Sequence, residues 1–180
     1  MKLHKPLIIC SAIVFAVAAM APSASADVAV GGGTLDFDPF GAPAIADFSA
    51  VTLNGTPQLT SVTVDPFTIV DATGSKAGWN VTLTVEDLVN AGAANDTILA
   101  ANISMSAPVV TGAGASDLTG VTGNASAGGF ATGEKIVVAT AGSGLGTYLV
   151  SPQILKLTVP VTAQTGTYTS LATIAVNSGP

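Results

Sequence analysis

The chain has 180 residues and a formal net charge of −6, and its single histidine and single cysteine, His4 and Cys10, both lie in the first ten residues. Beyond residue 26, three lysines stand against all 11 acidic residues and no arginine occurs, so this part of the chain carries a net charge of −8. These counts exclude, for that part, zinc sites built on Cys or His and catalysis by Ser–His–Asp or Cys–His groups. They also argue against nucleic acid as a partner, because few cations are available to neutralise phosphates.

The first 26 residues have the pattern of a cleaved secretory signal peptide. Lys2 and Lys5 precede an uncharged apolar run from Leu7 to Met20, and Ala24-Ser25-Ala26 matches a small-x-small cleavage site. The run is shorter than the roughly 20 residues that a membrane-spanning helix needs. We therefore expect a secreted protein whose mature domain spans residues 27–180, without a transmembrane anchor.

Period-two alternation of apolar residues predicts strands along most of the mature chain. In the clearest strand, Trp79, Val81, Leu83 and Val85 would face a core while the residues between them face water. The stretch up to Val161 repeats this design and would place Val161 inward. In chain order, the predicted strands are Phe48–Leu53, Gln58–Val64, Phe67–Val70, Trp79–Val85, Ile98–Met105, Lys135–Thr140, Thr147–Val150, Ile154–Val161 and Tyr168–Val176.

Two further segments have other patterns. Residues 86–94 (EDLVNAGAA) could form one short helical turn, and Thr111–Gly133, rich in Gly, Ala, Ser and Thr, is predicted to be one long loop. Many short strands separated by turn signals favour an all-β fold. We predict a single antiparallel β-sandwich of the immunoglobulin-like or Greek-key type.

The ionisable residues offer few constellations. Asp36 and Asp38 flank Phe37, and Glu86 is adjacent to Asp87. Such pairs could bind calcium or hydrolyse glycosides, but solvated surface charge is the favoured interpretation. We predict no metal site and no cofactor, and leave open a structural cation near four aspartates: Asp36, Asp38, Asp65 and Asp71.

Trp79 is the sole tryptophan, and two interpretations of its role remain open. A lone tryptophan that opens an amphipathic strand is usually a core anchor, because it has a large apolar area to bury. It could instead be an exposed platform that stacks on a sugar. The same choice applies to Tyr148 and Tyr168.

The segment Val70–Leu83 resembles the central motif of WxL-domain surface proteins. It has a strand ending in Val-Asp, a short Gly-containing turn, and then Gly78-Trp79 opening an alternating strand. Residues 99–105, 141–148, 157–160 and 165–168 are similar to successive parts of the same family. Two positions depart from its pattern, since Val81 stands where the family name has leucine and Ile174 stands where a second tryptophan would be.

This resemblance implies a non-catalytic domain that associates non-covalently with the peptidoglycan of a cell wall or with other surface proteins. It implies Trp79 as a binding residue, with Val81 and Leu83 as its strand partners, and Tyr168 is a further ligand-binding candidate. The alternative is a self-assembling structural subunit of a surface layer or matrix fibre, built by strand addition. A hydrolase is a third class, which would need two carboxylates about 5–10 Å apart.

Overall fold

The computed structural model describes residues 28–38, 40–92 and 96–180. The predicted signal peptide lies outside these residues. Gly31–Pro180 forms one compact unit, and the description below concerns that unit. No helix among the described residues has both the length and the apolar character that crossing a membrane requires.

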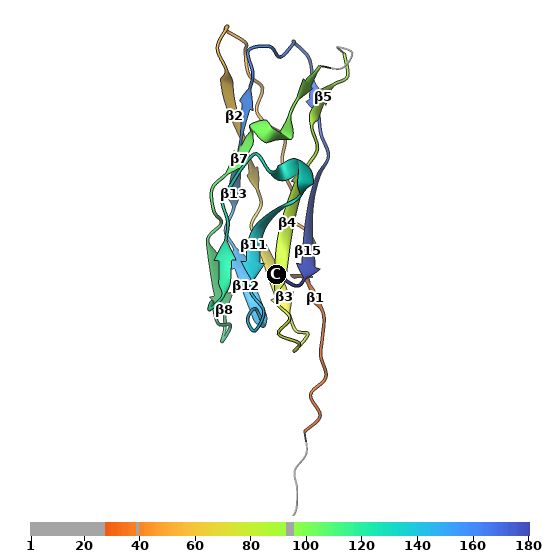
Figure 1. The fold of residues 1–180 in the computed structure, drawn as a ribbon, viewed down its shortest axis with the longest axis vertical. Helices are drawn as coiled ribbons and strands as arrows, with labels where there is room; N and C mark the ends of the chain where they lie inside the picture. The colour runs from red at the N-terminus through yellow and green to blue at the C-terminus, as the bar shows by residue number, and fades with distance from the viewer. Residues whose placement is uncertain (1–27, 39, 93–95) are drawn as a thin grey trace, which may run out of the picture. The chain divides into compact units, whose positions relative to one another are not determined.

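Short antiparallel strands are the main regular elements of this unit (Figure 1). The strands are β1 (Leu35–Asp38), β2 (Gln58–Val64), β3 (Phe67–Asp71), β4 (Trp79–Val85), β5 (Leu88–Asn90), β6 (Thr97–Ile98), β7 (Ile103–Met105), β8 (Val110–Ala113), β9 (Val121–Gly123), β10 (Ser126–Ala127), β11 (Glu134–Ala139), β12 (Gly146–Val150), β13 (Gln153–Val159), β14 (Tyr168–Thr169) and β15 (Ala172–Ser178). Two single-turn helices are η1 (Ala100–Asn102) and η2 (Phe130–Thr132).

The strands pair in four sheets. Sheet A has the order β1-β3-β12-β8, sheet B β10-β7-β13-β2, sheet C β15-β4-β11-β9 and sheet D β14-β5-β6. All pairings between strands are antiparallel. The predicted all-β class is therefore confirmed, whereas the immunoglobulin-like or Greek-key topology stays a prediction.

Sheets A and B continue one another along three strands. Val150 of β12 lies opposite Phe67 of β3, and Gln153 of β13 lies opposite Val64 of β2. Two residues therefore separate the paired segments on both strands, so one register runs through both sheets. The third strand follows the same rule, since β7 and β8 keep their register against β13 and β12. Figure 1 shows β13 above β12 and β7 above β8.

A line of prolines interrupts this long sheet at one level. Pro66 lies between β2 and β3, Pro152 between β12 and β13, and Pro108 between β7 and β8. Proline has no backbone N–H to give to a ladder, so the regular pairing stops at each of them. We call this line the proline break.

The inward-facing positions change parity at the proline break. Val64 and Phe67 are both buried, with two exposed residues between them instead of one. Val150 and Gln153 are buried in the same way on the neighbouring strand. Because side chains alternate along a strand, this shift lets each strand keep a buried row on both sides of the break.

One core receives side chains from sheets A to D. The ring centroids of Trp79 in sheet C and Tyr148 in sheet A lie 5.5 Å apart, and neither side chain is exposed. Such tilted aromatic pairs add to the gain from burying apolar area. Sheets A and C therefore pack face to face.

Several predicted strands appear at or near their expected bounds. They are 58–64, 67–70, 79–85, 135–140, 147–150 and 154–161. The inward prediction for Val161 is wrong, because β13 ends at Val159 before Pro160 and the Val161 side chain is 52% exposed. Asn80 lies on the outer face as predicted but does not face water, because its amide donates to the Gly179 carbonyl oxygen and is buried there.

Other segments differ from their predictions. Residues 48–53 form no strand, and the Thr60 hydroxyl on β2 donates to the Ser49 carbonyl oxygen at 2.7 Å. The two predicted strands 98–105 and 168–176 are each split, the first by η1 and the second at Ser170. Residues 86–92 contain strand β5 instead of a helical turn, and residues 93–94 lie outside the described residues.

The predicted long loop Thr111–Gly133 is also wrong. It contains most of β8, all of β9 and β10, and η2, whose Phe130 is fully buried. Its small residues allow close backbone approach, since a Cβ on Gly123 would lie 2.1 Å from the Pro108 carbonyl oxygen. The composition predicted a long loop, but in this segment the glycines let neighbouring backbone segments pack closely.

Candidate functional site

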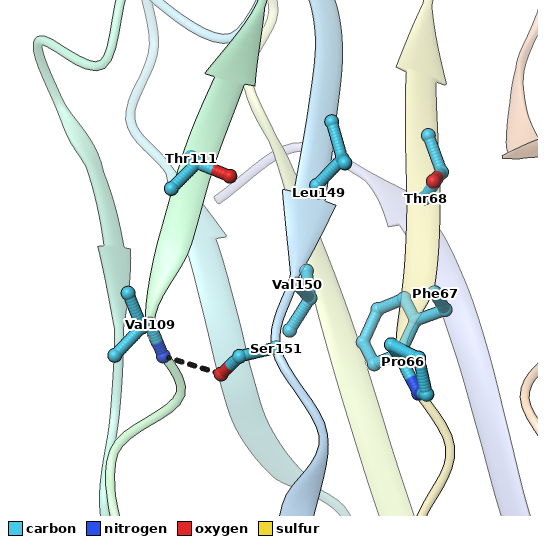
Figure 2. A pocket seen from close by; sticks show the side chains of 8 residues that line it. All are labelled: Pro66, Phe67, Thr68, Val109, Thr111, Leu149, Val150 and Ser151. Atoms are coloured by element: carbon cyan, nitrogen blue, oxygen red, sulfur yellow. Dashed lines mark hydrogen bonds between the residues drawn. The ribbon is translucent and has the colours of Figure 1, made fainter.

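A shallow hollow of about 430 Å³ opens where the proline break meets sheet A (Figure 2). We call it the first hollow. Its lining comes from three neighbouring strands and the segments that follow them: Pro66, Phe67, Thr68, Val109, Thr111, Leu149, Val150 and Ser151.

The exposed part of this lining is set by strand register. Leu149 of β12 lies opposite Thr68 of β3 on one side and Thr111 of β8 on the other. Figure 2 shows these three side chains side by side on neighbouring strands. Leu149 is 45% exposed and Val109 is 65% exposed, whereas Phe67 and Val150 turn into the core. The surface therefore joins aliphatic groups with threonine hydroxyls.

Side chains replace part of the missing ladder at the break. The backbone N–H of Ser151 donates to the Val109 carbonyl oxygen at 3.0 Å, and the Val109 N–H donates to the Ser151 hydroxyl at 3.2 Å. On the core side, the buried amide of Gln153 donates to the Ser151 hydroxyl at 3.0 Å and to the Ser151 carbonyl oxygen. These bonds hold the floor of the first hollow in shape.

A second hollow of about 310 Å³ adjoins the first, because Pro66, Phe67 and Thr68 line both. Its other lining residues are Asp38, Phe40 to Ala44 and Asp65. The Phe40 side chain is 94% exposed. This second hollow thus places an open aromatic ring near two carboxylates, which are common partners for the faces and hydroxyls of sugars.

Together the two hollows can bind but show no nucleophile held by a base. The first is lined by aliphatic and hydroxyl groups without an ionisable side chain, and the acids of the second are Asp38 and Asp65. Within the described part of the chain, no three His, Cys, Asp or Glu side chains gather as potential metal ligands. The arrangement suits an uncharged ligand with both apolar groups and hydroxyls.

The residues predicted from the family resemblance lie elsewhere. Trp79, Val81 and Leu83 share the inward face of β4, and each is 0% exposed. The Trp79 indole N–H donates to the Gly144 carbonyl oxygen at 2.8 Å. A sugar could not stack on this ring without opening the core, so these residues act on a ligand only through the fold they support.

Tyr168 is not brought near Trp79. It lies on β14 in sheet D, opposite Asn90, and is half-buried. Its hydroxyl bonds to the Asp96 carboxylate, and the Gln164 N–H donates to the same carboxylate at 2.8 Å. Tyr168, followed by Gln164, lowers the pKa of Asp96, while burial and then Asp96 raise the pKa of Tyr168. This cluster joins the segment after β13 to the residue that precedes β6.

Three of the acidic residues singled out in the sequence accept local hydrogen bonds. Asp87 accepts the N–H of Ala100 at 2.7 Å and so holds the start of η1. Asp71 accepts both the N–H and the hydroxyl of Thr73 in the turn after β3. Asp36 accepts the N–H of Phe37, whereas Asp38 reaches the second hollow.

Sequence reasoning missed the two hollows. The prolines at 66, 108 and 152 are visible in the sequence, but their alignment depends on the register of three strands. No model of a known protein family matches the chain. None of the curated proteins matches it either.

Proposed function

We propose that the chain is a secreted, non-catalytic surface domain, a divergent relative of the WxL domains, that attaches non-covalently to cell-wall peptidoglycan or to other surface proteins. The first hollow carries this proposal. Its outward groups combine aliphatic and hydroxyl chemistry on three neighbouring strands of sheet A and the residue before β8: Leu149, Val109, Thr68 and Thr111. Glycan strands present the same mixture of methyl groups and hydroxyls.

Charge supports a neutral part of the wall as the ligand. The mature chain carries a net charge of −8, so anionic wall polymers would repel it. The first hollow contains no ionisable group and can therefore accept an uncharged glycan. In the second hollow, Phe40 supplies an exposed face for the next sugar along the strand.

In this proposal Trp79 has a supporting part. It is buried between sheets A and C, where its bond to Gly144 fixes the loop that precedes β12. β12 carries Leu149, so the tryptophan positions the binding strand without touching the ligand. A buried Trp79 in sheet C is thus compatible with a ligand site on sheet A.

A sedimentation experiment tests the attachment. The full chain, expressed in a host that exports it, is mixed with isolated sacculi and pelleted, with and without EDTA. Leu149→Asp removes the central aliphatic contact of the first hollow and should lower binding about tenfold or more, because a carboxylate there must lose water among aliphatic side chains. The EDTA arm reports whether a divalent cation bridges the acidic domain to the wall.

Ile154→Asp is the matched control. Ile154 lies on β13, beyond the proline break from Leu149, and is 51% exposed. It should bind as the wild type does, and both variants should keep the wild-type melting temperature. Equal binding by the two variants would remove the first hollow from the proposal, and absence of wild-type binding would leave a surface protein as the partner.

The second candidate is the self-assembling structural subunit. The specific observation that favours it is β15, a seven-residue strand at the edge of sheet C. Unpaired strand edges are templates for further strands.

A further inference from the structure

Strand β15 has a partner on one side only. It pairs with β4 over all seven of its residues, from Ala172 opposite Val85 to Ser178 opposite Trp79. β1 lies close to it but pairs with β3 in sheet A, so it does not occupy the hydrogen-bonding positions of β15. Among the described strands, β15 and β2 are the longest at a sheet edge, with seven residues each.

The pairing with β4 fixes which backbone groups of β15 turn outward. The Glu86 N–H donates to the Leu171 carbonyl oxygen at one end, and the Gly179 N–H donates to the Gly78 carbonyl oxygen at the other, both at 2.9 Å. In an antiparallel pair, alternate residues exchange hydrogen bonds with the partner. The backbone N–H and C=O groups of the odd-numbered residues of β15 therefore point toward β4. The residues that turn N–H and C=O away from it are Ala172, Ile174, Val176 and Ser178.

Apart from the nearby β1, the described residues give this edge none of the usual protection against strand addition. No charged residue occurs between residues 171 and 180, and no proline lies within β15. β2, the other long edge strand, is covered in comparison. Ile45 bridges to Val64, and the Ser49 carbonyl oxygen accepts the Thr60 hydroxyl. Charges, prolines, bulges or covering segments are what keep natural edges from pairing.

We propose that two copies of this chain associate through β15, antiparallel to its own copy, with Ala175 on the two-fold axis. This register pairs all seven residues and places every outward-turned backbone group opposite another. Ile174 then lies opposite Val176 on the core side, and Thr173 lies opposite Asn177 on the outer side. No like charges meet across the axis.

The residue on the axis fits this geometry. Ala175 faces the outer side of sheet C and is half-buried. In the proposed register it meets its copy at a non-hydrogen-bonded position, where the two Cα atoms approach to about 4.5 Å. Two alanine methyl groups can meet there without steric conflict.

The association closes on itself. A two-fold interface uses the same patch on both copies, so it ends at two subunits and builds no fibre. This pairing is therefore an alternative to the self-assembling subunit, because it occupies the edge that strand addition would need. Each pair would present two copies of the first hollow. The pairing does not depend on wall attachment and is measured without sacculi.

Cysteine cross-linking tests the register, because Cys10 is the only cysteine of the chain. The full chain carries Cys10→Ser together with either Ala175→Cys or Thr173→Cys, and is treated with a mild oxidant. The two introduced thiols at 175 would lie within disulfide reach, whereas those at 173 would be about four residues apart along the strands. We expect at least about tenfold more covalent dimer from Ala175→Cys.

Sedimentation of the unmodified chain gives the second measurement. Its mass should rise toward that of a dimer with concentration, and Ala175→Lys, which puts two like charges on the axis, should stay monomeric with an unchanged melting temperature. Equal cross-linking at 173 and 175 would overturn the proposal. So would a wild-type chain that stays monomeric at its highest soluble concentration, or an Ala175→Lys variant that still dimerises.

Discussion

The indole N–H of Trp79 donates to the carbonyl oxygen of Gly144 across 2.8 Å, and thereby joins β4 to the loop before β12. Gly144 can approach so closely because its φ is +90°, and a Cβ there would lie 2.5 Å from the Trp79 ring nitrogen. Trp79 therefore stabilises the fold by joining these two segments, and four predictions test this and related contacts.

Gly144→Ala should destabilise the fold more than Gly142→Ala. Both glycines have a φ near +90°, so alanine is strained by about 1–2 kcal/mol at either position. Only at Gly144 does the new methyl meet other atoms, whereas at Gly142 nothing lies within 4 Å. Overpacking should add about 1–3 kcal/mol to the loss of unfolding free energy measured in urea. Equal losses would show that the Trp79 contact yields easily.

Gln153→Glu should weaken the proline break in a pH-dependent manner. The buried amide of Gln153 donates to Ser151, and a carboxylate in its place could only accept. The cost should exceed about 1–3 kcal/mol at neutral pH. Burial raises the pKa of the new carboxyl, so the deficit is full at neutral pH and shrinks as acid protonates it.

The control for this variant is Gln58→Glu, whose amide donates to Asn54 in an exposed turn where water can replace it. Urea unfolding at several pH values measures both. If the stability lost in Gln153→Glu did not change with pH, the proposed role of the Gln153 amide as a buried donor would be wrong.

Asp96 should contribute stability that is lost in acid. Its carboxylate accepts hydrogen bonds from Tyr168 and Gln164, which lower its pKa from the ordinary 3.8. The contribution is thus complete above about pH 4 and disappears as the pH falls through the lowered pKa of the folded state. Asp96→Asn should melt below the wild type at pH 7, and the gap should close below pH 3.8. A gap that persists in acid would argue against the carboxylate.

Thr60→Val should release the segment that runs beside β2. The Thr60 hydroxyl is buried and donates to the Ser49 carbonyl oxygen, whereas Thr63 on the same strand is exposed. Removal of that donor should cost about 1 kcal/mol, and Thr63→Val should be nearly neutral. Faster hydrogen exchange or proteolysis near residue 49 in the Thr60 variant alone would support the tie. The same pattern in both variants would contradict it.

Much of the strand content follows from the sequence, because alternation of apolar residues marks one buried face. Trp79–Val85 and Gln58–Val64 have the bounds that their patterns predict. The rule failed where small residues dominate, as in β9, since glycine carries no hydropathy signal even when it packs against Pro108.

The candidate site was harder to predict than the strands. Leu149 looks like any outward residue of a strand until its neighbours are known, and Thr68 and Thr111 lie about 80 and 40 residues from it in the chain. Trp79 stood out by its rarity, but rarity does not say which way a ring faces. Register between distant strands decides both, and a single sequence does not contain it.

The parity change at the proline break makes three distant parts of the gene depend on one another. At Asp65-Pro66, at Ser151-Pro152 and between Met105 and Pro108, two residues stand between successive buried positions. Loss of one codon at any of these places would invert every side chain beyond it on that strand, while its neighbours kept their phase. Length variants should therefore survive in the turns at the strand ends, and at the break only when all three strands change together.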